Sequence, residues 1–148
     1  MEYLKELLYI NDMDVFKEYG VFLTETEAGG HTNYDALLLP PKLKEYVVVD
    51  FREEDGEKLP DNLIPRYEAR DVTLHFALRA SNPIAWKTKY TAFLTLLKSG
   101  WLNIRVPELD KTYRMYVKEF SSYEQPTPFA GEIYCRFKVR FREPNPSF

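Results

Sequence analysis

Two histidines and one cysteine are the residues of this 148-residue chain best suited to catalysis or metal binding. His31 lies in a polar, glycine-containing stretch, and His75 lies on the polar side of an alternating apolar segment. A general base or a metal pair would need both imidazoles to meet across the fold, so we expect two unrelated surface histidines. Cys135 alternates with Ile133 and Phe137, which predicts a small buried side chain rather than a catalytic thiol.

A cluster of carboxylates surrounds Gly56, and its members are Asp50, Glu53, Glu54, Asp55 and Glu57. The cluster lacks the alternating Asp spacing with which calcium loops surround the ion, so we expect a solvated acidic loop. The pair Gly29-Gly30 has no following Lys-Ser/Thr and opens no helix, which argues against a phosphate-binding loop. The sequence therefore predicts no catalytic residue, no cofactor and no metal site.

The last predicted strand carries a row of one tyrosine and four basic residues on its polar side: Tyr134, Arg136, Lys138, Arg140 and Arg142. Such a row can follow a phosphate backbone while the tyrosine stacks on a base, which predicts a nucleic-acid-binding β-barrel as one possible function. Basic residues on an outer strand also prevent edge-to-edge pairing, and they can contact an acidic neighbouring subunit. The acidic chain, with a net charge of −3 and a pI near 5.5, favours this second interpretation.

Charge is divided unevenly along the chain. Residues 1–83 contain 9 Lys/Arg and 17 Asp/Glu, a net charge of −8, whereas residues 84–148 contain 11 and 6, a net charge of +5. This division fits two differently solvated faces of one monomer. It also fits a subunit whose acidic side meets the basic side of the next copy. In that case we expect the basic row to form the interface and Glu53, Glu54, Asp55 and Glu57 to form its acidic counter-surface.

Composition favours one β-rich domain over residues 1–148. Hydrophobic residues make up 45% of the chain and charged residues 29%, which is typical of globular proteins, and the 11 tyrosines and 10 phenylalanines favour sheets and interfaces. One cysteine excludes an internal disulfide framework. No apolar run approaches the ~20 residues that a membrane-spanning helix needs, and the first residues are acidic where a signal peptide is basic, so we expect no membrane association.

Hydrophobic periodicity predicts the elements that carry these residues. We expect short strands over 7–12 and 21–25, separated by a helical turn that ends at Gly20, and then a polar loop over 26–34. A short apolar run follows, which Pro40-Pro41 ends. Further strands are predicted over 46–51, 70–80, 101–106, 111–120 and 132–143, with an acidic loop over 52–66 and another loop over 121–131.

Residues 82–99 form the one predicted helix of substantial length. Asn82 is a good N-cap, and Pro83 sits at the first helical position, where its missing N–H costs nothing. One apolar stripe follows, made of Trp86, Tyr90, Phe93, Leu94 and Leu97. A lone amphipathic helix must cover a sheet. We therefore predict an α+β fold: an antiparallel β-sandwich or partly closed barrel with one amphipathic helix, about 82–99, packed across it, and a short extended tail over about 143–148.

Three segments of this layout stand out. The first is a strand that leads into an Asn-Asp turn over 9–15, the second is Glu-Tyr-Gly-Val over 18–21, and the third runs from the helix end, 90–97, through the strands over 101–106 and 113–117. Together they resemble the amino-terminal domain of siphophage distal tail proteins and the related tail-tube and baseplate-hub domains. The carbohydrate-binding-like second domain that many distal tail proteins carry has no counterpart in the sequence.

The resemblance implies a non-enzymatic structural protein of a phage or prophage tail, made in the bacterial cytoplasm and located in the virion tail. It implies a homo-oligomeric ring, commonly a hexamer, that contacts other tail or baseplate proteins. DNA would cross the channel of that ring as passing cargo. The loops over 26–34 and 52–66 are long enough to reach adjacent subunits.

Overall fold

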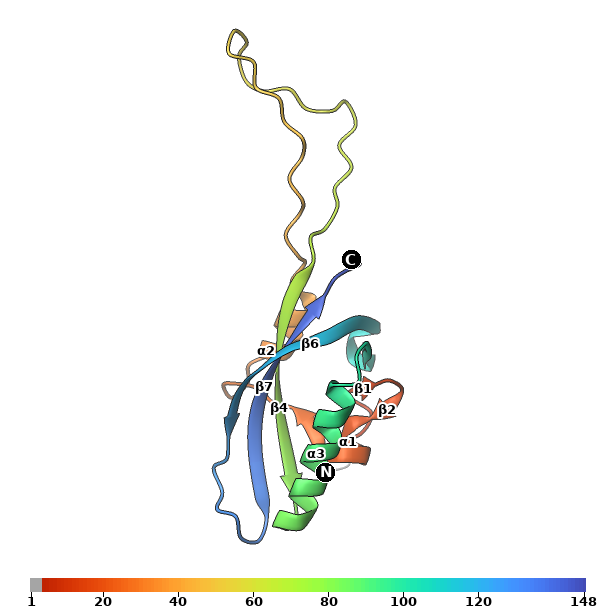
Figure 1. Ribbon diagram of the computed structural model, residues 1–148, viewed down its shortest axis with the longest axis vertical. Coiled ribbons are helices and arrows are strands. Elements are labelled where there is room, and N and C mark those ends of the chain that lie inside the picture. Colours follow the sequence, from red (N-terminus) through yellow and green to blue (C-terminus); the bar gives the residue numbers. More distant parts are fainter. Residues whose placement is uncertain (1–3) are drawn as a thin grey trace.

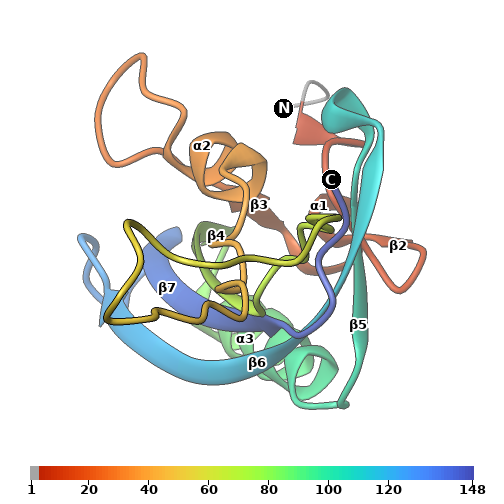
Figure 2. The same cartoon turned by 90° about the horizontal axis from the view of Figure 1, so that it is seen from above.

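The computed structural model describes residues 4–148 and contains a seven-stranded antiparallel sheet that curls into a half-barrel (Figures 1 and 2). This architecture confirms the predicted α+β class, and it corresponds to the partly closed barrel among the alternatives. The strands lie in the order β2-β1-β5-β6-β7-β4-β3. Their bounds are β1 Tyr9–Ile10, β2 Met13–Asp14, β3 Val21–Leu23, β4 Arg70–Ala80, β5 Leu102–Val106, β6 Lys111–Glu124 and β7 Ile133–Glu143.

Strands β4, β7 and β6 form the long centre of the sheet. The β4–β7 pairing runs without interruption from Arg70 opposite Glu143 to Ala80 opposite Ile133. Strand β6 pairs with β7 through two register shifts and continues to Glu124, so residues 121–124, predicted as loop, are strand. The reason is that β7 continues alongside them and pairs with Ser122, Tyr123 and Glu124.

Helix α3 (Pro83–Leu97) packs across this sheet as predicted (Figure 1). The Asn82 side chain accepts a hydrogen bond of 2.8 Å from the Ala85 backbone N–H, and Pro83 opens the first turn. Two residues of this helix, Phe93 and Leu97, are fully buried in the core. Local sequence signals at the helix start and one apolar stripe are therefore sufficient to define this element.

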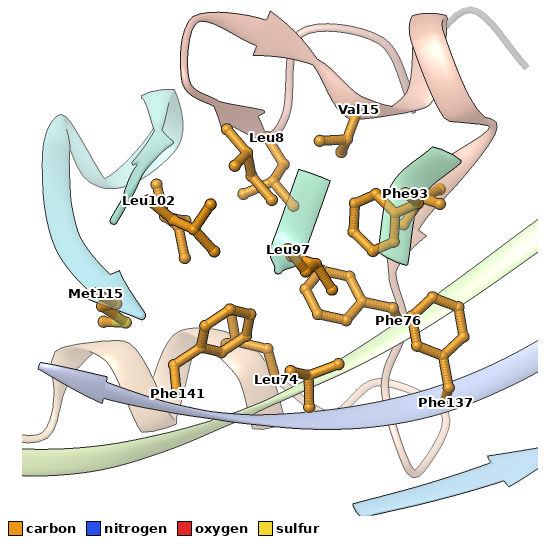
Figure 3. Close-up of a cluster of buried hydrophobic side chains, with 14 of the residues drawn as sticks. Leu8, Val15, Leu74, Phe76, Phe93, Leu97, Leu102, Met115, Phe137 and Phe141 are labelled. Carbon is orange, nitrogen blue, oxygen red and sulfur yellow. The ribbon is translucent and has the colours of Figure 1, made fainter. Parts of the chain in front are cut away.

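The space between α3 and the sheet is filled by aromatic and aliphatic side chains (Figure 3). Phe76 lies at its centre, with ring centroids 5.4 Å from Phe93, 5.6 Å from Phe137 and 6.2 Å from Phe141. These four rings come from β4, β7 and α3. They join the helix to the two longest paired strands in one hydrophobic core.

Two short helices accompany the amino-terminal strands. Helix α1 (Val15–Tyr19) is capped by Asp14 and ends at Gly20, whose φ of 68° lies in the left-handed region, as predicted. Helix α2 (Thr32–Leu38) was not predicted, because it is short and its N-cap, His31, makes no side-chain capping bond. A single-turn 3-10 helix, η2 (Pro107–Leu109), joins β5 to β6 at the predicted turn.

The predicted strand over 46–51 is wrong. Every residue from 42 to 66 is exposed, and these residues form a long two-legged projection, here called the arm (Figure 1). β-branched residues such as Val47 favour strands only where neighbours cover a face, and the arm has no such neighbours. Pro60 and Pro65 in the returning leg cannot donate to a ladder, which further limits pairing between the legs.

The chain after β7 lies near the base of the arm (Figure 1). The Phe148 ring lies 4.9 Å from the Arg70 guanidinium, 3.7 Å from the Lys111 ammonium and 5.8 Å from the Tyr67 ring. The single-domain organisation over 1–148 stays a prediction. In residues 4–148, no helix is long and apolar enough to cross a membrane.

Candidate functional site

The two histidines lie in different surroundings. His31 is exposed at the start of α2, and His75 is half-buried on β4. Among the described residues, no hydroxyl or carboxylate is hydrogen-bonded to either imidazole, and no group of three or more His, Cys, Asp and Glu residues is arranged to hold a metal ion. Burial and the nearby Lys138 ammonium lower the pKa of His75. His75 thus disfavours its charged form in the fold, and this group makes the protein less stable as the pH falls below the ordinary histidine range.

Cys135 points into the core from β7 and is fully buried. Burial raises the pKa of its thiol, which opposes formation of the reactive thiolate. The side chain behaves as the small hydrophobe that its alternation with Ile133 and Phe137 predicts.

We expect Cys135 to react with iodoacetamide more than about 100-fold more slowly in the folded protein than in denaturant, because the thiol becomes accessible only through opening of the sheet. Mass spectrometry after timed quenching measures both rates. A chain with Cys135→Ala and Ser121→Cys, which places the thiol at an exposed strand position, is the control and should react rapidly when folded. Equally fast labelling of native Cys135 would contradict its burial.

The basic row on β7 is paired within the protein. Arg136 contacts Glu124 at 2.7 Å, Arg140 contacts Glu119 at 3.3 Å, and Arg142 contacts Asp71 at 2.9 Å. The carboxylates come from the two flanking strands, β6 and β4, so the arginines form cross-strand ion pairs along the sheet. These pairs reduce the positive charge that the row presents to a phosphate backbone or to an acidic surface.

The fourth basic residue of the row differs from the arginines. Lys138 is exposed and lines a hollow of about 230 Å³ together with His75. Tyr134, at the start of the row, is half-buried, and its backbone N–H donates to the Thr127 hydroxyl. The role of this row as a subunit or DNA interface stays a prediction.

Asp71 links the row to β6. It accepts hydrogen bonds from Arg142 at 2.9 Å and from Lys118 at 3.1 Å, and the hydrogen bond from Arg142 is the main cause that lowers the pKa of its carboxyl. This interaction therefore contributes stability above the ordinary aspartate range, and the contribution is lost as the pH falls through the lowered pKa.

The predicted acidic counter-surface lies at the far end of the arm. Val49 and Lys58 exchange two backbone hydrogen bonds, of 2.9 and 2.6 Å, and so close a tip over residues 50–57. Gly56 turns the chain there with a φ of 72°. The tip contains five acidic residues and one arginine, a net charge of −4, and all of it is exposed.

The base of the arm is held by pairing of its two legs. Leu43 and Tyr67 form an isolated bridge, and the Lys44 backbone N–H donates to the Arg66 carbonyl at 2.8 Å. Between this base and the tip, no backbone hydrogen bond joins the described residues of the two legs. The arm thus has a fixed root and a closed tip, but its legs lack a sheet or core of their own.

The arm also carries a concentration of exposed apolar side chains. Nine of the 18 exposed large hydrophobic residues among the described residues belong to it, and Val47 is the most exposed of these nine, at 78%. The nine are Leu43, Tyr46, Val47, Val48, Val49, Phe51, Leu59, Leu63 and Ile64. Monomeric soluble proteins rarely leave so much apolar surface together in water, so this segment is a candidate binding element.

Sequence reasoning missed the arm because the apolar run over 46–51 has the composition of a buried strand. The signal that could have identified it is the surrounding proline pattern. Pro40-Pro41 precede the run, Pro60 and Pro65 follow it, and no complementary strand of similar length lies between them.

No protein-family model and no curated protein sequence matches the chain. The structure is similar to the crystal structure of the SPP1 Dit (gp 19.1) protein, described as a paradigm of the hub adsorption apparatus in phages that infect Gram-positive bacteria. The TM-score is 0.47 at 10% sequence identity, over 90% of this chain and 49% of that protein. The chain therefore spans about half the length of that neighbour.

Proposed function

We propose that this protein is a non-enzymatic structural subunit of a phage or prophage tail, of the distal-tail or tail-tube kind. It self-associates into a ring around the DNA channel and contacts other tail or baseplate proteins. The observation that carries self-association is the arm, an exposed apolar projection with a fixed root. The tail assignment rests on the sequence resemblance of residues 9–21 and 90–117 to distal-tail and tail-tube domains.

The arm suits binding to another protein chain. Its legs leave main-chain N–H and C=O groups unpaired beside apolar side chains, and such an extended segment can align on a partner surface. Binding would remove apolar side chains such as Val47 and Ile64 from water, which is the dominant favourable term in protein association. The fold itself gains nothing from exposing them.

The geometry favours a head-to-tail contact. The arm extends from one end of the long axis of the molecule, well away from α1 and α3 at the other end (Figure 1). An arm that binds a different surface on its neighbour makes a heterologous contact, because the two contacting surfaces are unlike. Such contacts generate rings where the rotation closes.

The test is the mass of the full chain in solution. We expect size exclusion with light scattering, run over a series of protein concentrations, to show oligomers, and negative-stain images of the peak to show rings. A monomer at every concentration, with no cross-linked species after glutaraldehyde treatment, would overturn the proposal.

A chain with a shortened arm identifies the element responsible. Because residues 44 and 66 are already hydrogen-bonded, a short Gly-Ser turn can replace residues 46–64 without moving the root. We expect this variant to keep the circular dichroism spectrum and melting temperature of the parent and to be monomeric. Oligomers of unchanged size would remove the arm from the interface.

A further inference from the structure

Another charged surface, besides the arm tip and the basic row, lies toward the end of the molecule opposite the arm. It is a groove of about 450 Å³ between α1 and α3, here called the basic groove, lined by Lys5, Phe16, Lys17, Gly20, Arg79 and Lys89. Four of its six lining residues are cationic, and the other two are the aromatic Phe16 and Gly20, which has no side chain.

At this groove the end of α1 packs closely against β4 and α3. Gly20 ends α1, and a Cβ at this residue would lie 3.5 Å from the Lys89 ammonium and 3.0 Å from the Arg79 carbonyl oxygen. The absence of a side chain at Gly20 thus lets the end of α1 lie close to the Arg79 carbonyl oxygen of β4, and the Lys89 ammonium of α3 lies within ordinary contact distance. Arg79 is paired with Glu132, whereas Lys17 is exposed on the outer side of α1.

The basic groove and the arm tip are complementary in charge. The tip carries a net charge of −4 within eight residues, and Phe51 in it is 49% exposed. The basic row on β7 is the less favourable partner for the tip, because three of its four cations already contact carboxylates of the same chain. A chain cannot bring its own tip to its own basic groove, since the arm extends from one end of the long axis and the helices α1 and α3, which line the groove, lie toward the other (Figure 1).

We propose that the basic groove between α1 and α3 is the acceptor for the acidic arm tip of a second copy of this chain. The tip carboxylates would contact Lys17 and Lys89, and Phe51 would pack against Phe16. This inference rests on the proposed self-association and specifies its contact surface. Unlike charges at the two ends of each subunit also set the direction of assembly, since tip-to-tip and groove-to-groove encounters repel.

The first experiment replaces two of the four cations of the basic groove by glutamate. We expect Lys17→Glu with Lys89→Glu to weaken self-association about tenfold or more at ~50 mM salt, and the deficit to shrink at ~500 mM salt, where exposed charges are screened. The matched control is Lys87→Glu with Lys98→Glu, which makes the same change in net charge at exposed positions outside the groove.

The second experiment restores the pairing. Glu53→Lys with Asp55→Lys brings the net charge of the tip from −4 to 0, and we expect this variant alone to associate as poorly as the groove variant. An equimolar mixture of tip and groove variants should associate about as well as the parent, because the unchanged tip of one variant meets the unchanged groove of the other, and the introduced lysines face the introduced glutamates. Circular dichroism and melting temperature confirm that all variants are folded.

The outcomes separate the two proposals. If the parent associates and the groove and control variants associate equally well, the basic groove is not the acceptor, whereas the proposed self-association still holds. Absence of association in the parent would overturn the proposed function itself. Failure of the tip and groove mixture to recover, although both variants fold, would contradict direct pairing between these two surfaces.

Discussion

Replacing Glu143 by glutamine is expected to lower the free energy of unfolding by about 3–5 kcal/mol, the usual cost of removing one partner from a buried ion pair. Glu143 accepts a hydrogen bond of 2.7 Å from the Arg70 Nε, and the two side chains are only 4% and 8% exposed. Glutamine is similar in size but leaves the Arg70 charge without a counter-ion. The measurement is urea unfolding followed by circular dichroism at one fixed, low protein concentration.

The effect is expected to be large because Arg70 joins three elements. Its Nη1 donates to the carbonyls of Ala36 at 3.3 Å and Leu39 at 2.7 Å, at the end of α2, while its Nε reaches β7. This end of the helix carries partial negative charge that favours a cation. An uncompensated Arg70 therefore destabilises the joint between α2, β4 and β7, from which the arm also starts.

Glu124→Gln is the matched control for this prediction. Glu124 forms an ion pair of the same length, 2.7 Å, with Arg136, but the two side chains are 65% and 41% exposed. Water screens such a pair, so we expect a loss of about 0–1 kcal/mol. Equal losses in the two variants would show that burial does not govern the Arg70–Glu143 interaction.

Replacing Asn33 by alanine is expected to cost about 2–4 kcal/mol of unfolding free energy, because it leaves buried backbone groups without partners. Asn33 is fully buried on α2. Its side-chain oxygen accepts from the His75 N–H at 2.7 Å, and its amide donates to the carbonyls of Thr24 at 2.8 Å and His75 at 3.3 Å. The amide thus continues the pairing of β4 beyond the point where β3 ends at Leu23.

Thr26→Ala provides the control. The Thr26 hydroxyl lies 2.9 Å from the Thr32 hydroxyl in the same region, but this hydrogen bond is exposed to water. We expect a change within about 0.5 kcal/mol, as for most surface substitutions. Amide hydrogen exchange distinguishes a local from a global effect: the His75 amide should lose protection in Asn33→Ala and keep it in Thr26→Ala. A fully protected His75 amide in Asn33→Ala would contradict the proposed loss of its acceptor.

The sequence alone determined the elements whose signals are local. Asn82 and Pro83 define the start of α3, and regular alternation defines β4 and β7, because caps and periodicity act between residues a few positions apart. The carboxylates around Gly56 lack the Asp spacing of a calcium loop, so the sequence also predicted a solvated acidic loop there. The structure places this loop at the arm tip.

Tertiary structure alone decided which segments are exposed and which charges are paired. The apolar run over 46–51 has strand composition, yet it pairs with no strand of the sheet and extends into water instead. The basic side chains of β7 lie on the face that alternation predicts. Their carboxylate partners, however, lie on the neighbouring strands and are 12 to 71 residues away along the chain. Likewise, Asn33 reaches its partner at His75 only once α2 packs on β4. Ion pairs and hydrogen bonds between such residues depend on how close they lie in space, and their separation along the chain does not predict this distance.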